Sequence, residues 1–223
     1  MTVSDNIKQF LKTEIPDNVK LIAVSKTKPV EMILEAYHSG HKIFGENKVQ
    51  DLAAKYEDLP KDIEWHMIGH MQSNKVKYIA PFVSLIHGVD SFKLLKVIHK
   101  EGEKNNRKID CLLQFHIAKE ETKFGLDLTE AYEFLRSDQF KNLNNVNICG
   151  VMGMATFTEN EDTIRSEFKE LVHIFNELKE TIFINSADFK EVSMGMSGDY
   201  KIAIEEGATM VRIGSLLFGA RNY

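Results

Sequence analysis

A lysine ends an apolar run near the start of the sequence. The stretch LIAVSKTKP, residues 21–29, places four apolar residues directly before Ser25 and Lys26. Lysine is almost never fully buried unless another group pairs with it. Either Lys26 reaches solvent where a strand ends, or it points into a site and does chemistry. A lysine within a site forms a Schiff base with an aldehyde when burial or neighbouring cations keep its amine neutral.

Two segments near the C-terminus combine small residues with hydroxyl groups. They are SMGMSGD, residues 193–199, and RIGS, residues 212–215. Small residues let the backbone approach an anion, and successive N–H groups form an anion-binding nest. Ser197 and Ser215 add hydroxyl donors, and each segment leads into helix-forming sequence, whose first N–H groups favour the same anion. Together with Lys26, this pattern favours a ligand that carries both an aldehyde and a phosphate.

The elements that must position these residues alternate between short apolar runs and helical patterns. We expect strands at residues 21–25, 42–44, 64–68, 83–87, 109–117, 146–151, 191–194 and 209–213. We expect helices at residues 29–39, 47–56, 73–79, 91–101 with a stop at Gly102, 129–136, 200–206, and after a capping box formed by Thr158 and Glu161. Repeated strand–helix alternation implies a parallel sheet with helical crossovers.

Eight such units in 223 residues fit an α/β protein with a (β/α)8 TIM barrel. The alternative is an open Rossmann-like sheet, but no GxGxxG follows the first strand. An extra N-terminal helix at residues 3–11 would cover the bottom of the barrel. No Pro/Gly/Ser-rich linker interrupts the sequence, so we expect a single domain over residues 1–223. Functional groups of such barrels lie at the C-terminal ends of the strands, where Lys26 and both small-residue segments fall.

Composition argues against several classes of protein. The net charge of −5 disfavours nonspecific nucleic-acid binding, which needs a basic surface. No apolar run approaches the roughly 20 residues that span a bilayer, and the N-terminus lacks a signal-peptide core. Cys111 and Cys149 lie in apolar runs, which predicts free thiols in a reducing compartment. We therefore expect a cytoplasmic protein that binds neither nucleic acid nor membrane.

Histidine and cysteine residues are weaker candidates for a site. His66 and His70 are four residues apart, but the strand context gives no helical ligand pair and HExxH is absent, so no metal site is expected. His87 and His116 are expected at the rim or in the core. Cys149 lies in an apolar strand, where thiols are usually inert.

The motifs, taken in order, resemble one family. AVSKTKP, FGEN, WHMIGHMQSNK, KFG at 123–125, GVMGMAT, SMGMSGDY, AI at 203–204 and RIGSLLFGARNY closely resemble the pyridoxal phosphate homeostasis proteins. Members of that family are single-domain barrels similar to the N-terminal domain of bacterial alanine racemases. The resemblance covers about residues 21–223. Each motif alone is a weak signal, but eight in order are a strong one.

The resemblance implies a binding site for pyridoxal 5'-phosphate (PLP) and assigns no catalytic residue. The residues implied to bind the cofactor are Lys26, Asn47, Met152, Ser197, Gly198, Arg212, Gly214 and Ser215. Lys26 would hold PLP as a Schiff base, and the serines and glycines would hold its phosphate. Asn47 and Met152 would line the pocket around the ring.

Arg212 would face the pyridine nitrogen. Because arginine is always charged and only donates hydrogen bonds, it would keep this nitrogen unprotonated and the ring a weak electron sink. Such a ring allows racemisation and disfavours broad transaminase or decarboxylase activity. Three positions depart from the family pattern: Ser215 stands where threonine is usual, His116 where asparagine is usual, and GHM at 69–71 also differs.

Three functions follow from these features. The first is a non-catalytic PLP-binding protein of vitamin B6 homeostasis, whose protein partners would be apo-enzymes that need the cofactor. The alternative is a PLP-dependent amino-acid racemase of reduced, single-domain form, with Lys26 as one base and His66 or His116 as the other. A third, weaker idea is a Schiff-base aldolase acting on a sugar phosphate. The tail at 215–223 is too short for the second domain that racemases of similar fold use.

Overall fold

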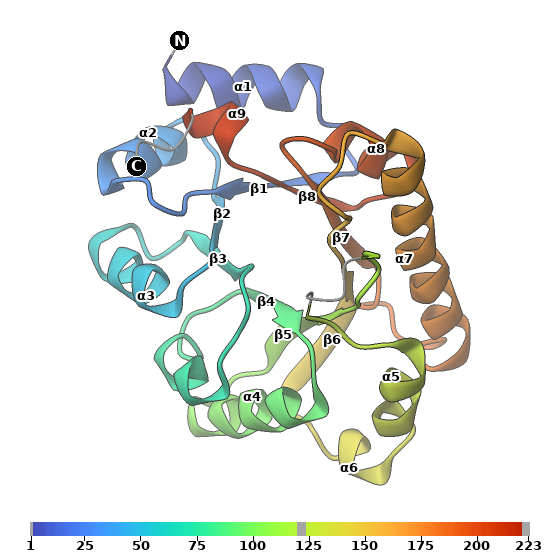
Figure 1. Cartoon of the computed structure of the whole chain (residues 1–223). Coiled ribbons are helices and arrows are strands. Elements are labelled where there is room, and N and C mark those ends of the chain that lie inside the picture. Colours follow the sequence, from blue (N-terminus) through green and yellow to red (C-terminus); the bar gives the residue numbers. More distant parts are fainter. Residues whose placement is uncertain (1, 120–123, 220–223) are drawn as a thin grey trace.

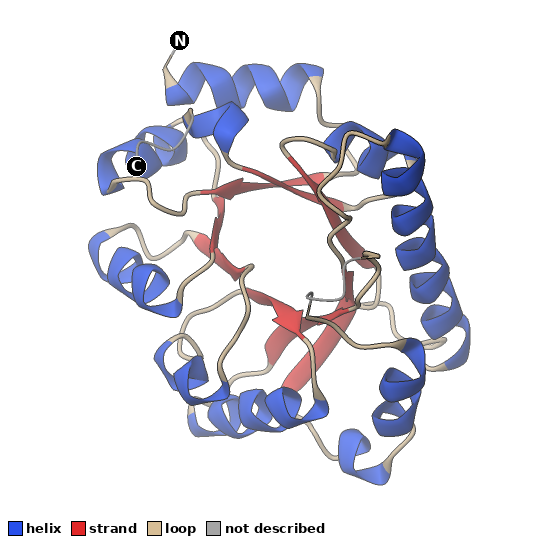
Figure 2. Cartoon of the chain, viewed as in Figure 1, coloured by secondary structure: helices blue, strands red, loops and turns tan. Residues whose placement is uncertain are grey.

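Eight parallel strands close into a barrel, surrounded by helices (Figures 1 and 2). The computed structural model describes residues 2–119 and 124–219. Each strand pairs with its neighbour along the chain, and the first pairs with the last. The strands are β1 (Lys20–Val24), β2 (Ile43–Glu46), β3 (Glu64–Met67), β4 (Leu85–Val89), β5 (Ile109–Gln114), β6 (Val146–Met152), β7 (Glu191–Met196) and β8 (Met210–Ile213). The predicted TIM barrel is confirmed.

The helices lie on the outer side of the barrel, as crossovers between parallel strands require (Figure 2). They are α1 (Val3–Thr13), α2 (Val30–His38), α3 (Val49–Asp58), the 3-10 helix η1 (Ser73–Tyr78), α4 (Phe92–Lys104), α5 (Leu128–Leu135), α6 (Asp138–Lys141), α7 (Glu161–Thr181), α8 (Tyr200–Glu205) and α9 (Ser215–Phe218). No helix of the described ranges has the length and apolar composition needed to cross a bilayer.

The extra N-terminal helix is present, but the prediction that it covers the barrel bottom is wrong. Helix α1 lies in the outer ring and packs against α2 and α9 (Figure 1). It buries Val3, Ile7 and Phe10, and Asn6 Nδ2 donates to the carbonyl of Leu217 at 3.1 Å. Helix α9 is only one turn long, so the outer ring has room after β8. The apolar side of α1 fills that room.

Two predicted helix ends also differ from the structure. Gly102 does not stop α4 but lies buried within it. A larger residue would not fit there, because a Cβ would come within 2.9 Å of the carbonyl oxygens of Arg107 and Asn145. The glycine therefore serves close packing against the following loop. The N-cap of α7 is Asn160, whose side chain accepts from Thr163 N at 3.1 Å, so the capping box expected from Thr158 is wrong.

Side chains inside the barrel form layers of different character. One group of these side chains, called here the apolar layer, contains Ile22, Leu85, Leu112, Cys149, Met152 and Met210. Buried polar side chains also project from β3, β4, β7 and β8. Strands that are buried on both faces are nearly continuous apolar runs in the sequence. Such runs reveal where a strand lies, but they do not reveal which of its side chains face the barrel interior.

Candidate functional site

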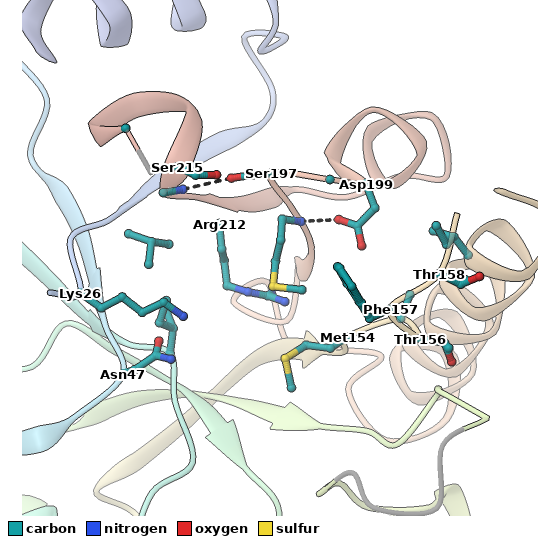
Figure 3. A pocket seen from close by; sticks show the side chains of 18 of the residues that line it. Lys26, Asn47, Met154, Thr156, Phe157, Thr158, Ser197, Asp199, Arg212 and Ser215 are labelled. Carbon is teal, nitrogen blue, oxygen red and sulfur yellow. Dashed lines mark hydrogen bonds between the residues drawn. The ribbon is translucent and has the colours of Figure 1, made fainter. Parts of the chain in front are cut away.

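A cavity of about 480 Å³ opens where the strands end (Figure 3). The residues that line it come from both ends of the sequence: Val24, Lys26, Lys28, Asn47, Ile68, 154–158, Ile164, 196–199, Arg212, Gly214, Ser215 and Gly219. Figure 3 shows Lys26 and Asn47 on one side, Arg212 between them and the loop after β6, and Ser197 and Ser215 above. Of the eight residues predicted for the site, seven line this cavity.

Lys26 lies two residues after the end of β1 and is positioned by a sharp turn. Thr27 adopts a left-handed conformation with φ 64°, and Lys28 N donates to the Ser25 carbonyl at 3.0 Å. Lys28 Nζ donates to the carbonyls of Phe218 and Gly219, at 3.0 Å each. The loop that carries Lys26 is thereby tied to the end of α9.

A buried acid supports the same loop from outside the barrel. Glu46, at the end of β2, is fully buried and accepts from Ser25 Oγ at 2.6 Å and from Lys55 Nζ at 2.7 Å. Lys55 Nζ also donates to the Ser25 carbonyl at 2.8 Å. Burial raises the pKa of the Glu46 carboxyl, and Lys55 opposes that rise. The residue before Lys26 is thus held on both its side chain and its backbone.

We expect Lys55→Met to destabilise the fold by about 3–5 kcal/mol at neutral pH, because it leaves the Glu46 carboxylate buried without its cation. Since burial raises the folded pKa of Glu46 above its ordinary value, the folded state binds more protons than the unfolded state in the range between the two values, and stability falls as pH rises through it. Without Lys55 this fall should be steeper and extend further. Urea unfolding of the variant between pH 4.5 and 8 measures this pH dependence of stability.

Lys42→Met is the control, because its exposed ion pair with Asp62 should contribute little to stability. Equal losses of stability in both variants would contradict the prediction.

Four small residues form the other end of the cavity. Ser197 Oγ accepts from Gly214 N at 3.4 Å and joins the loop after β7 to the end of β8 (Figure 3). A Cβ added at Gly198 would meet no atom within 4 Å, so this glycine leaves open space rather than filling a packed position. Ser215 begins α9, where first-turn N–H groups have no partner within the helix. Hydroxyl and backbone donors around open space suit a phosphate group.

Arg212 extends from β8 into the cavity and is 4% exposed. Its Nη1 donates to Ser193 Oγ at 2.6 Å and its Nη2 to the Gly153 carbonyl at 3.0 Å. Burial lowers the pKa of Arg212 to about 10, which still leaves it charged at neutral pH. Two neutral oxygens fix the guanidinium, so some of its five N–H donors remain for a ligand.

Met152 is the predicted site residue that the structure places elsewhere. It is 1% exposed and belongs to the apolar layer inside the barrel. Met154 lines the cavity instead. Met152 is the last residue of β6, and Met154 lies in the loop beyond it. The methionine that lines the cavity is therefore two residues later than the sequence predicts.

The four histidines considered in the sequence analysis do not line the cavity. His116 is exposed. His70 pairs with Asp90 at 3.1 Å and stacks on Phe124 with ring centroids 4.2 Å apart. His66 is buried, and its Nδ1 lies 3.0 Å from His87 Nε2. Neither His66 nor His116 lines the cavity into which Lys26 extends.

The sequence analysis missed the wall formed by the loop after β6. Thr156, Phe157 and Thr158 line the cavity, and Phe157 is 99% exposed (Figure 3). The buried carboxylate of Glu167 accepts from Thr156 N at 2.7 Å and from Thr156 Oγ1 at 2.8 Å. The sequence signal was the ATFT stretch directly after a strand. Two predicted motifs extend outside the described residues, at Lys123 and at 220–223.

Comparisons with known proteins agree with this architecture. The family model for the alanine racemase N-terminal domain matches residues 2–222. The pyridoxal phosphate homeostasis protein of Aquifex aeolicus is 43% identical over 208 residues, covering 92% of this chain and 88% of its relative. The human protein of that name is 35% identical, covering 92% of this chain and 77% of its relative.

Solved structures give the same result. PipY of Synechococcus elongatus, solved with PLP bound, superposes with a TM-score of 0.87 at 33% identity and covers 98% of this chain and all of its own. Alanine racemase from Bartonella henselae shares only the fold, with a TM-score of 0.70 at 16% identity over 98% of this chain and 58% of that enzyme. The chain therefore belongs to the pyridoxal phosphate homeostasis protein family and has the fold of the alanine racemase N-terminal domain.

Proposed function

We propose that this protein binds PLP as a Schiff base on Lys26 and serves vitamin B6 homeostasis without catalysing a reaction. The observation that carries the proposal is the arrangement of one cavity. Lys26 enters it from the end of β1, Arg212 enters from β8, and the small-residue segments bound it at the ends of β7 and β8. PLP presents an aldehyde, a pyridine nitrogen and a phosphate, and this cavity offers a group suited to each.

The chain's own residues have separate roles in this proposal. Lys26 forms the imine bond, and Ser197, Gly198, Gly214 and Ser215 hold the phosphate. Arg212 faces the pyridine nitrogen, and Asn47 lines the ring. PLP in general supplies an electron sink for chemistry at an amino acid's α-carbon; a charged Arg212 weakens that sink because it donates to the nitrogen instead of accepting its proton. Met154 takes the ring-lining role first assigned to Met152.

The positions of the histidines favour a carrier over a racemase. Racemisation needs a base on each side of the α-carbon, and Lys26 could supply one. The candidates for the other were His66 and His116, and neither lines the cavity. Sustained inversion of a pure L-amino acid by the purified protein would instead support the single-domain racemase.

The wider setting of the protein belongs to the same proposal. We propose one barrel domain over residues 1–223, located in the cytoplasm. Both cysteines are free and buried, and burial raises the pKa of Cys149 to about 12, which suits thiols that stay reduced and inert. Apo-enzymes that require PLP are the proposed protein partners.

The absorption spectrum of the purified protein with added PLP tests the proposal. We expect a visible band that borohydride abolishes, and a reduced adduct that peptide mass mapping places on Lys26. An adduct spread over several surface lysines, or no reducible band at all, would contradict the proposed site.

A further inference from the structure

A chain of four polar side chains crosses the barrel interior from the cavity. Arg212 Nη1 donates to Ser193 Oγ at 2.6 Å, Ser193 Oγ lies 2.9 Å from His87 Nδ1, and His87 Nε2 lies 3.0 Å from His66 Nδ1. Arg212 and Ser193 project from the neighbouring strands β8 and β7, whereas His87 and His66 project from β4 and β3 on the opposite side of the closed barrel. We call these four residues the interior relay.

The direction of the hydrogen bonds follows from the donor at one end. Arginine has no acceptor, so Ser193 Oγ accepts from Arg212. A hydroxyl has one hydrogen of its own, and donating it to His87 Nδ1 leaves the other ring nitrogen, Nε2, as an N–H. That N–H then donates to His66 Nδ1. In this arrangement each of the three contacts contains one hydrogen, and the reverse tautomer would leave the Ser193 hydrogen without an acceptor among the residues that the structure describes.

The positive charge of the interior relay lies on Arg212, at the end that faces the cavity. All four side chains are buried, at 0–5% exposure. Burial lowers the pKa of His66 to about 3, assisted by Lys20, and lowers that of His87 far below its usual value, assisted by His66 and Arg212. Both imidazoles are therefore neutral at neutral pH, while Arg212 stays charged. Arg212 is therefore the charged member of the interior relay at neutral pH.

We propose that His87, backed by His66, is a positioning residue that orients the Ser193 hydroxyl so that Arg212 is held in the cavity with free donors directed at the cofactor. The inference rests on the proposed function, because Arg212 acts on PLP only if the cavity binds it. The Gly153 carbonyl fixes the second nitrogen of the guanidinium at 3.0 Å, so the Ser193 bond determines the remaining freedom of the group. The groups that support the cofactor site then reach across the barrel to β3 and β4, two strands that do not contact the ligand in this proposal.

Nitrogen-15 NMR of the histidine rings tests the relay without any cofactor. In the ligand-free protein we expect the His66 and His87 rings to stay neutral from pH 6 to pH 8, with His87 carrying its hydrogen on Nε2. Spectra of His87→Asn and His66→Gln assign the two rings. A protonated His87 ring near pH 7, or a hydrogen on Nδ1, would overturn the proposed orientation.

Variants then test whether the relay acts on the site. We expect His87→Leu to weaken PLP binding about tenfold and to shift the absorption band of the bound cofactor, because Ser193 loses the acceptor that orients its hydroxyl toward Arg212. His87→Asn, whose amide still reaches Ser193, should restore most of both. Met210→Leu, a volume-conserving change in the apolar layer on the same strand as Arg212, is the matched control and should bind as the parent does.

The outcomes separate this inference from the proposed function. If the parent protein forms no reducible band with PLP, the proposed function fails and the inference fails with it. If the parent forms the band and His87→Leu matches it in position and affinity, the inference alone fails. Equal effects of His87→Leu and Met210→Leu would show general packing and also overturn it. Should His87→Leu not fold, Ser193→Ala interrupts the relay by losing one oxygen, and the same shift is expected.

Discussion

Lys26→Ala is expected to abolish the borohydride-reducible band completely while leaving weak PLP binding that inorganic phosphate competes away. In the proposed site the imine bond depends on one amine, whereas Ser197, Gly198, Gly214 and Ser215, which line the other end of the cavity, would hold the phosphate. Charge-assisted hydrogen bonds to a phosphate are strong enough to persist alone. We expect affinity to fall by about a hundredfold or more, which corresponds to about 2.7 kcal/mol. Equilibrium dialysis with and without phosphate measures both parts.

The control for this experiment is Lys8→Ala, an exposed lysine on α1 that lies outside the cavity. It should keep the parent's band and affinity. If a well-folded Lys26→Ala variant loses all PLP binding, the phosphate contacts do not act independently of the imine. If it keeps a reducible band, the imine forms elsewhere and the assignment of Lys26 is wrong.

Replacing Arg212 with methionine is expected to separate function from stability. The guanidinium is a buried charge held by neutral oxygens, and exchanging such a charge for an apolar side chain of similar length often costs little. We expect the ligand-free variant to unfold within about 1 kcal/mol of the parent, rather than with the 2–5 kcal/mol loss typical of a core truncation. PLP affinity should nevertheless fall about tenfold, and the band of the bound cofactor should shift.

Arg212→Lys is the companion variant, because it keeps the charge but loses the fork of N–H donors. It should bind PLP better than Arg212→Met and worse than the parent. Urea unfolding and spectral titration on the same preparations give both readouts. An unchanged spectrum and affinity in Arg212→Met would show that Arg212 does not face the ring.

The buried acid Glu46 and the interior relay share a physical property. Both place ionisable groups inside the fold, where burial penalises charge, and both support a residue that lines the cavity. Glu46 and Lys55 act on the loop that carries Lys26, from the outer side of the barrel. The interior relay acts on Arg212 from within it. Groups whose pKa is perturbed by burial cluster at functional sites.

The fold class and the rim of the site can be predicted from sequence patterns alone. Alternation of apolar runs with helical patterns requires parallel strands with crossovers, and the strand ends then place Lys26 and the two serine-containing segments on one edge. These inferences need only local spacing, because the side-chain period of a strand and the direction of a crossover are fixed by backbone geometry.

Contacts between side chains of different strands become visible only in the folded barrel. Met154 rather than Met152 lines the cavity, because Met152 ends β6 and packs inside the barrel, whereas Met154 lies in the loop beyond the strand. Likewise, α1 joins the outer ring, where it packs against α2 and the single-turn helix α9. His66, His87, Ser193 and Arg212 come from strands far apart in the sequence, and closure of the barrel brings them within hydrogen-bonding distance. Local spacing carries no information on such contacts, because they depend on the register and curvature of all eight strands together.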